Sequence, residues 1–348
     1  MGGMACNICT SYEGKNTCVR ATRIGHIECL RYLHEVEGES LNGVCLEAVE
    51  RGYVECLKYA HEKGGRLTKK MLIKAVKKGS VECLQYAHEK GYPWDVGICN
   101  TAALYGQIGC LRYAHENGCP WDEWTCTYAA YLGHIECLRY AHENGCPWNK
   151  KTCDHAADKG HIECLIYAHI NGCSWDEETC ASAASHGRLQ CLKYAHENEC
   201  PWNEATCASA ALNGRLQCLR YAHENGCPWN KDTCSYAAGN GHLQCLVYAH
   251  KKKCPWDEDT CAGAADAGNI ECLIYAHLKK CPWNENTQYK ASRNGHLQCL
   301  KYAHIQGCQW NEHTCYEAVN DENEDIIGYI HAQDNPPCTP ETCALKKK

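Results

Sequence analysis

Cysteine and histidine are the residues best able to do chemistry in this chain, which has 33 cysteines and 20 histidines among its 348 residues. Many of them lie in a recurring nine-residue stretch, of which "YAHENGCPW" from Tyr140 to Trp148 is one copy. Thiolates and imidazoles are ligands of zinc, and pairs of cysteines can form disulfides. The stretch could therefore be a repeated metal or redox site, or part of the core of a structure built from copies.

The histidine of this stretch recurs with a constant step. His115 and His142 are 27 residues apart, and the same step continues without insertion. The histidines in this register are His34, His61, His88, His115, His142, His169, His196, His223, His250, His277, His304 and His331. A fixed period of this length is typical of stacked repeats. We expect one array over residues 17–332, a loose N-terminal segment over residues 1–16, and a tail over residues 333–348 that starts a truncated repeat.

A single repeat predicts two short helices joined by a tight turn. Asp122 suits the N-cap of the first helix, whose cysteine and two alanines fall on one face. Gly133 suits the left-handed position that ends this helix, and a second helix should run through "HIECLRYAHE" until Gly145. Neither helix is long enough to be stable alone, so neighbouring repeats must bury each other's faces. The sequence predicts an all-α solenoid of about twelve stacked helix-turn-helix repeats.

The repeat resembles the ankyrin repeat over nearly the whole chain. Against the ankyrin pattern T-P-L-H-x-A-A-x-x-G-H-x-E-V-V-x-x-L-L-x-x-G-A-x-V-N, the matching positions are Ala129, Ala130, Gly133, His134, Glu136, Leu138, Gly145 and Asn149. Ankyrin repeats are typically about 33 residues long, and the residues missing here fall where ankyrins build their β-hairpin finger. "T-P-L-H" is also reduced to "T-C". The resemblance implies a fingerless ankyrin-like solenoid that binds proteins.

The same resemblance places most of the chemically active residues in the structural core. Cysteine is a small and usually buried side chain. In the registers of the three cysteines of the repeat, other copies have Leu72, Ile326 and Tyr92, which cannot bind a metal. A partly buried histidine needs a hydrogen-bond partner, which we expect to be a carbonyl or hydroxyl of the adjacent repeat. We therefore expect no metal and no cofactor, and the predicted core residues are Cys126, Cys137, Leu138, His142, Cys146 and Trp148.

Two chemical alternatives stay open at this point. His142 and Cys146 are four residues apart and could share a helical face, which leaves a zinc-binding repeat as the lesser alternative. Cys146 and Cys153 could approach each other across the loop and form a ladder of disulfides, although only geometry decides such a bond. Catalysis is not expected, because the histidines recur without a serine, carboxylate or thiol partner that would complete a triad.

The residues that differ between copies are the candidates for binding. In ankyrins the corresponding face of the first helix lines the groove that holds partners, and tyrosine is enriched at binding hot spots. We predict a non-catalytic protein–protein interaction scaffold that recognises an unknown protein. Its predicted partner-binding residues are Tyr128, Tyr131, Asp154, His155, Asp158, Ser182, His186 and Tyr236.

Composition limits the other classes of partner. The net charge is −7 and no long apolar run occurs, so we expect no nucleic acid or membrane partner. The start of the chain does not resemble a signal peptide, which predicts a cytoplasmic monomer with reduced thiols. Short repeats of this kind also resemble those of large DNA viruses of amoebae, which implies a viral protein, a host partner and the host cytoplasm. The alternative is a structural, self-assembling or particle-associated solenoid.

Overall fold

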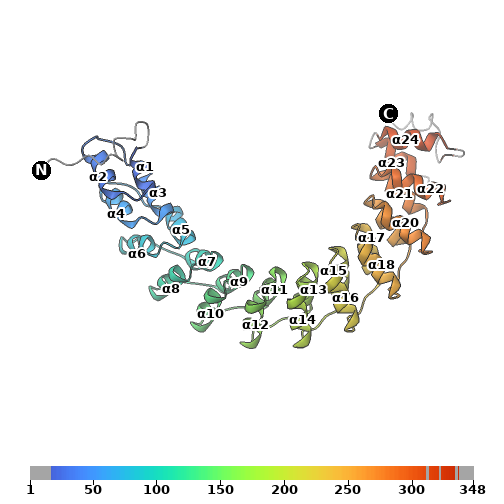
Figure 1. The fold of residues 1–348 in the computed structure, drawn as a ribbon, viewed down its shortest axis with the longest axis horizontal. Coiled ribbons are helices and arrows are strands. Elements are labelled where there is room, and N and C mark those ends of the chain that lie inside the picture. The colour runs from blue at the N-terminus through green and yellow to red at the C-terminus, as the bar shows by residue number, and fades with distance from the viewer. Residues whose placement is uncertain (1–16, 311–312, 321–322, 334–335, 337–348) are drawn as a thin grey trace. The chain divides into compact units, whose positions relative to one another are not determined.

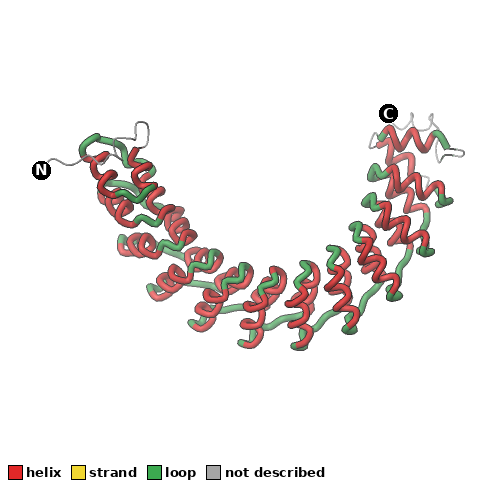
Figure 2. Tube along the Cα trace, viewed as in Figure 1, coloured by secondary structure: helices red, strands yellow, loops and turns green. Residues whose placement is uncertain are grey.

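The chain folds into helices alone. The computed structural model describes residues 17–310, 313–320, 323–333 and 336, and it contains 24 α-helices and no strand among them (Figures 1 and 2). The predictions of an all-α fold, of twelve helix pairs and of missing β-hairpin fingers are therefore confirmed for the described part of the chain. The predicted N-terminal segment and most of the predicted tail lie outside the described residues.

Each repeat contributes a helix A followed by a helix B. The A helices are α1 (Thr17–Arg23), α3 (Val44–Arg51), α5 (Lys69–Lys78), α7 (Val96–Leu104), α9 (Glu123–Tyr131), α11 (Lys150–Lys159), α13 (Glu177–Ser185), α15 (Glu204–Leu212), α17 (Lys231–Gly239), α19 (Glu258–Asp266), α21 (Glu285–Arg293) and α23 (Thr314–Asn320). The B helices are α2 (Ile27–Glu35), α4 (Val54–Glu62), α6 (Val81–Glu89), α8 (Ile108–Glu116), α10 (Ile135–Glu143), α12 (Ile162–Ile170), α14 (Leu189–Glu197), α16 (Leu216–Glu224), α18 (Leu243–Lys251), α20 (Ile270–Leu278), α22 (Leu297–Ile305) and α24 (Glu324–His331).

The helices form two compact units. The first comprises Met1–Ala156 and Glu163–Ser174, and the second comprises Ala157–Ile162 and Trp175–Lys348. Inside each unit, A helices contact the next A helix and B helices contact the next B helix. In the first unit α7 contacts α9 and α8 contacts α10, while in the second α15 contacts α17 and α16 contacts α18. A single array over residues 17–332 stays a prediction.

The ends of the helices follow from three residue types in the repeat. Asp122 has an extended backbone, and its carboxylate accepts a hydrogen bond from the amide of Trp124 at 3.1 Å, which caps α9. Gly133 and Gly145 follow the C-caps of α9 and α10 with φ angles of 76° and 82°, a conformation that favours glycine. The predicted N-cap and both predicted helix ends are confirmed.

The core between the helices is built from small side chains and one large one per repeat. On α9, Cys126 and Ala130 are fully buried, and Leu138 of α10 is fully buried against them. The leucine in this register is among the largest fully buried side chains in every repeat from Leu30 to Leu300. Burying a leucine stabilises a fold by roughly 1.5–3 kcal/mol, so the stacked repeats supply what an isolated helix pair lacks.

Candidate functional site: variable helix A residues over a Cys-His-Trp-Tyr core

Three cysteines of the repeat are buried in the core of the fold. Cys126, Cys137 and Cys146 are all at least 97% buried. Burial raises the pKa of the Cys137 thiol to about 12, so it stays protonated at neutral pH. The thiolate is the form that attacks electrophiles and binds metals. Cys137 therefore contributes packing rather than reactivity, whereas the side-chain hydrogen bond with Cys126 lowers the pKa of Cys146.

The geometry around Cys146 differs from the disulfide ladder that the sequence left open as an alternative. Cys146 is a free thiol. The Cys146 thiol donates a hydrogen bond to the carbonyl oxygen of Asp122 at 3.2 Å, and the Cys126 thiol lies 4.0 Å from the carbonyl oxygen of Cys146. Among the described residues, no group of three or more His, Cys, Asp and Glu side chains is arranged to hold a metal ion.

The histidines form joints with the next repeat. His142 stacks on Trp148, with ring centroids 3.8 Å apart, and its Nδ1 shares a hydrogen bond of 2.9 Å with the hydroxyl of Tyr167. Tyr167 also meets Trp148 edge to face at 6.2 Å. The prediction that these histidines bond a hydroxyl or carbonyl of the adjacent repeat is confirmed for this joint. His142 and Trp148 are half-buried.

The tyrosine of each helix B is the residue that sequence reasoning left unassigned. Tyr140 bonds Nδ1 of His115 in the preceding repeat at 3.1 Å, and the Arg112 guanidinium lies 4.8 Å from its ring centroid. Burial raises the pKa of this hydroxyl. The signal in the sequence is the constant spacing of 25 residues between each histidine and the tyrosine that it bonds. Stacking and hydrogen bonding together fix the spacing between successive repeats in each unit.

An aromatic cluster lies on the A helices of the first unit. The rings of Trp124 and Tyr128 are 5.5 Å apart, and the Lys151 ammonium lies 5.0 Å from the centroid of Trp124. Tyr131 meets His155 of α11 edge to face at 5.4 Å. Trp124 is 36% exposed, while both tyrosines and His155 are half-buried. The structure therefore brings Tyr131 and His155 together across two neighbouring A helices, and it places Tyr128 beside Trp124 within α9.

Two residues of this cluster were not predicted from the sequence. Trp124 and Lys151 occupy the second position of helix A, where later repeats have Glu178 and Ala205. This position varies as much as the predicted ones, which is the signal that could have identified it. The predicted residue Asp154 lies half-buried on α11 beside the cluster.

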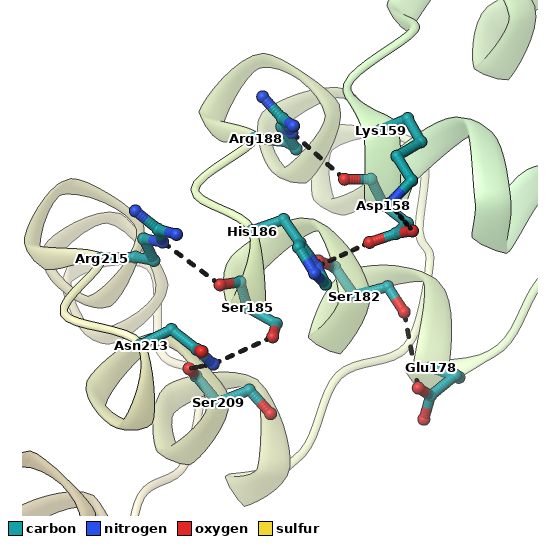
Figure 3. Close-up of polar contacts among 10 residues, drawn as sticks. All are labelled: Asp158, Lys159, Glu178, Ser182, Ser185, His186, Arg188, Ser209, Asn213 and Arg215. Atoms are coloured by element: carbon teal, nitrogen blue, oxygen red, sulfur yellow. Dashed lines mark hydrogen bonds and ion pairs between the residues drawn. The ribbon is translucent and has the colours of Figure 1, made fainter. Parts of the chain in front are cut away.

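A polar network connects successive A helices in the second unit. Figure 3 shows Asp158 of α11 and His186, which caps the C-terminus of α13, pointing toward each other. Their Oδ1 and Nδ1 atoms are 2.6 Å apart, and the Lys159 ammonium lies 3.1 Å from the other oxygen of Asp158. Nδ1 of His186 is also 3.2 Å from the carbonyl oxygen of Ser182.

The network continues along the same edge of the second unit. The Ser182 hydroxyl is 3.4 Å from Glu178, and the Asn213 amide donates to the Ser185 hydroxyl at 3.0 Å (Figure 3). Two arginines that precede B helices each donate Nε to a carbonyl oxygen of the preceding repeat, Arg188 to Asp158 at 3.1 Å and Arg215 to Ser185 at 3.3 Å. These bonds hold the polar side chains in one arrangement at the surface.

Tyr236 stands apart from the other predicted residues. It is 42% exposed on α17 of the second unit. The residues at the same repeat position on the adjacent A helices are Ser209 and Gly263, which are small. The Tyr236 ring is therefore free to contact a partner, but it does not belong to the polar network of Figure 3.

The helix B side of the first unit also has a surface groove. A groove of about 780 Å³ lies between α10 and α12, and its lining includes Ile135, Ile166 and Ile170. Glu136 and Arg139 are also part of the lining, so both signs of charge border it. The charges of the groove therefore favour neither an acidic nor a basic ligand.

The architecture described above is that of a helical repeat protein. Its units are built from stacked A and B helices whose cores and joints repeat every 27 residues. Residues 126–169 match the family model of ankyrin repeats present in many copies. This match and the repeated helix pairs support the ankyrin-repeat superfamily as the family of the chain. Comparison with curated proteins finds no match.

Membership of this family has a functional consequence at a coarse level. Ankyrin repeats generally mediate protein–protein interaction and are typically not enzymes. None of the helices in the described ranges is long and apolar enough to cross a membrane.

Proposed function

We propose that this chain is a non-catalytic scaffold that binds a protein partner through the variable side chains of its A helices. The observation that carries the proposal is the aromatic cluster of Trp124, Tyr128, Tyr131 and His155. Tryptophan and tyrosine are enriched at binding hot spots because they bury a large area with few rotatable bonds. The cluster occupies positions that change from repeat to repeat, while the core and the joints are nearly constant.

The fixed spacing of the repeats supports this mechanism. The A helices of a unit are held against one another mostly by buried cysteine and alanine, and several B helices by a bond between histidine and tyrosine, as between His142 and Tyr167. A partner therefore meets side chains that are already oriented, which reduces the entropy lost on binding. The polar network of Asp158, Ser182 and His186 supplies a second prearranged surface, in the second unit.

The experiment is affinity capture of a partner from extracts of the source cell, quantified for matched variants. Trp124→Ala with Tyr128→Ala should lower capture of the specific partner by about tenfold or more, as expected for a hot spot. Tyr53→Ala is the control, because Tyr53 is also an exposed tyrosine but lies outside the cluster. Circular dichroism should show unchanged helix content in both proteins. Equal capture by the cluster variant and the control would reject this surface.

Two further parts of the proposal rest on the sequence. We propose one continuous monomeric array over residues 17–332, which predicts a single elongated particle of constant mass in light scattering across concentration. The alternative, a self-assembling solenoid, predicts a mass that grows with concentration. Elemental analysis of protein purified without added metal tests the zinc-binding alternative, because stoichiometric zinc would contradict a purely structural role for the cysteines.

The resemblance to repeats of amoebal DNA viruses supports a finer proposal, that the partner is a host protein in the host cytoplasm. A tagged copy expressed in amoebae should then distribute through the cytoplasm and co-purify with a host protein. A distribution confined to the nucleus or to membranes would contradict it.

A further inference from the structure

The ends of α18 and α20 in the second unit differ in charge from the other B helices. Most repeats end helix B with an acidic pattern, as in "HENG" from His142 to Gly145. The corresponding residues are "HKKK" after α18 and "HLKK" after α20. Five exposed lysines therefore replace glutamate, asparagine and glycine on two neighbouring repeats, and they are Lys251, Lys252, Lys253, Lys279 and Lys280.

Exposed aliphatic side chains lie on the same edge. Leu278 at the end of α20 is 67% exposed, and Ile305 at the end of α22 is 72% exposed. The helix α20 contacts both α18 and α22, so these side chains and the lysines belong to one surface. We call this surface, formed by the five lysines with Leu278 and Ile305, the lysine edge.

The charges of the lysine edge are not balanced inside the protein. Among the described residues, none of its five lysines forms an ion pair, whereas Lys231 on α17 pairs with Asp257 at 2.6 Å. The positive charges of these lysines also act on the histidines between repeats. Burial lowers the pKa of His250, and the positive charge of Lys279 lowers it further. A concentration of one sign without partners attracts ligands of the other sign.

The backbone of two of these lysines is unfavourable. Lys253 and Lys280 both have a φ of 65°, in the register where Gly145 has a φ of 82°. Left-handed backbone disfavours any residue with a Cβ. Lysines in the last turn also interact favourably with the helix dipole, but that interaction does not require lysine at the left-handed position. Glu199 has the same left-handed backbone, so this conformation alone does not distinguish the lysine edge. The combination of backbone strain with positive charge does.

We propose that the lysine edge binds an acidic segment of a protein partner, whose aliphatic side chains pack on Leu278 and Ile305. Nucleic acid would pair with the lysines and leave both aliphatic side chains exposed, and a bilayer would gain only two exposed aliphatic side chains. An acidic segment with interspersed aliphatic residues complements both features. The lysine edge lies on the helix B side and does not depend on the proposed function of the A helices.

The repeat spacing restricts the form of the segment. Lys252 and Lys279 are one repeat apart, and packed helices are separated by roughly 8–10 Å. A chain in the extended polyproline II conformation advances about 3.1 Å per residue and presents every third side chain on the same face, so carboxylates three residues apart match successive repeats. The expected ligand is an extended segment with an acidic residue at every third position.

The test is a binding titration with a fluorescein-labelled peptide of four Glu-Leu-Ser triplets, followed by anisotropy at low salt. The lysine variant carries Lys252→Asn, Lys253→Gly, Lys279→Asn and Lys280→Gly, which restores residues that the chain itself uses at Asn144 and Gly145. It should bind about tenfold or more weakly, because four of the five complementary charges are gone. It should also melt at the same temperature as the wild type or higher, since glycine relieves the backbone.

A charge-matched control removes four lysines elsewhere, by changing Lys69, Lys70, Lys77 and Lys78 of α5 to asparagine. The control should bind the peptide like the wild type, while Leu278→Ser with Ile305→Ser should weaken binding at unchanged charge. Equal binding by the wild type and the lysine variant would overturn the proposal, as would equal binding of a peptide of Gln-Leu-Ser triplets. Lysine-dependent sedimentation with phosphatidylserine vesicles, without peptide binding, would also overturn it in favour of a membrane.

Discussion

Two glycines that flank one B helix share a backbone conformation but differ in their surroundings. Gly106 and Gly118 have φ angles of 67° and 79°. A Cβ added to Gly106 would lie 2.6 Å from Nδ1 and 2.7 Å from Cε1 of His134, whereas nothing lies within 4 Å of a Cβ added to Gly118. Alanine at each position therefore separates the cost of the backbone from the cost of packing between repeats.

The magnitudes follow from this geometry. Left-handed backbone costs a residue with a Cβ about 1–2 kcal/mol, and alanine recovers about 0.4–1 kcal/mol by restricting the unfolded chain. Gly118→Ala should therefore lower the free energy of unfolding by about 1 kcal/mol. Gly106→Ala should cost about 1–3 kcal/mol more, because the His134 ring must move in a packed interface.

The assay is urea unfolding followed by far-ultraviolet circular dichroism, with hydrogen exchange of the amides in α8 as the local measure. Local exchange matters because a repeat array can unfold in parts. Equal losses in the two variants, or a larger loss for Gly118→Ala, would refute the argument. The chain contains a related comparison, since the register of Gly118 also accommodates Glu199, Lys253 and Lys280, whereas the register of Gly106 holds glycine in every repeat from Gly25 to Gly295.

Three further predictions concern the core and the joints. Tyr167→Phe removes the hydroxyl bonded to His142 and should lower the free energy of unfolding by about 1 kcal/mol in urea titrations. An unchanged free energy of unfolding would contradict a stabilising role for this bond. Burial lowers the pKa of His223 and His250, so the unfolded state binds more protons and stability should fall as pH drops below about 6.5; a urea midpoint that is flat or rising from pH 8 to pH 5 would contradict this. Cys137 should react with a thiol reagent at least about a hundredfold more slowly in the native protein than in urea, because it is buried and protonated. Comparable rates would show that Cys137 is accessible to solvent in the native protein.

The local structure of the repeat was predictable because its signals are local. The Asp122 cap and the left-handed Gly133 each act within a few residues of sequence, and the constant step of 27 residues indicates stacking. These signals predicted the helix pairs and their ends. The role of Tyr140 was not predictable in the same way, because its partner His115 lies in the preceding repeat and the bond depends on how two B helices pack.

The candidate surface was predictable in part. Variation between copies predicted Tyr128 and His155, and the same variation at the position of Trp124 was missed. Variation also cannot show which residues meet, and the contact between Asp158 and His186 required coordinates. The lysines of the lysine edge can be read from the sequence. Their interpretation as a binding surface depends on the structure, because only coordinates show that no carboxylate of the described residues pairs with them.

The joint between repeats has a consequence for how such a chain can lengthen. From the repeat of Trp94 to the repeat of Trp310, each copy carries a histidine and a tryptophan on one side and a tyrosine on the other, so each can accept a neighbour and be accepted by one. Tandem duplication of a single repeat therefore creates a new interface that is already complementary, and deletion of one leaves no mismatched ends. Gene length can drift in whole steps without selection for new contacts, while the exposed A helix positions of each added copy are free to diverge.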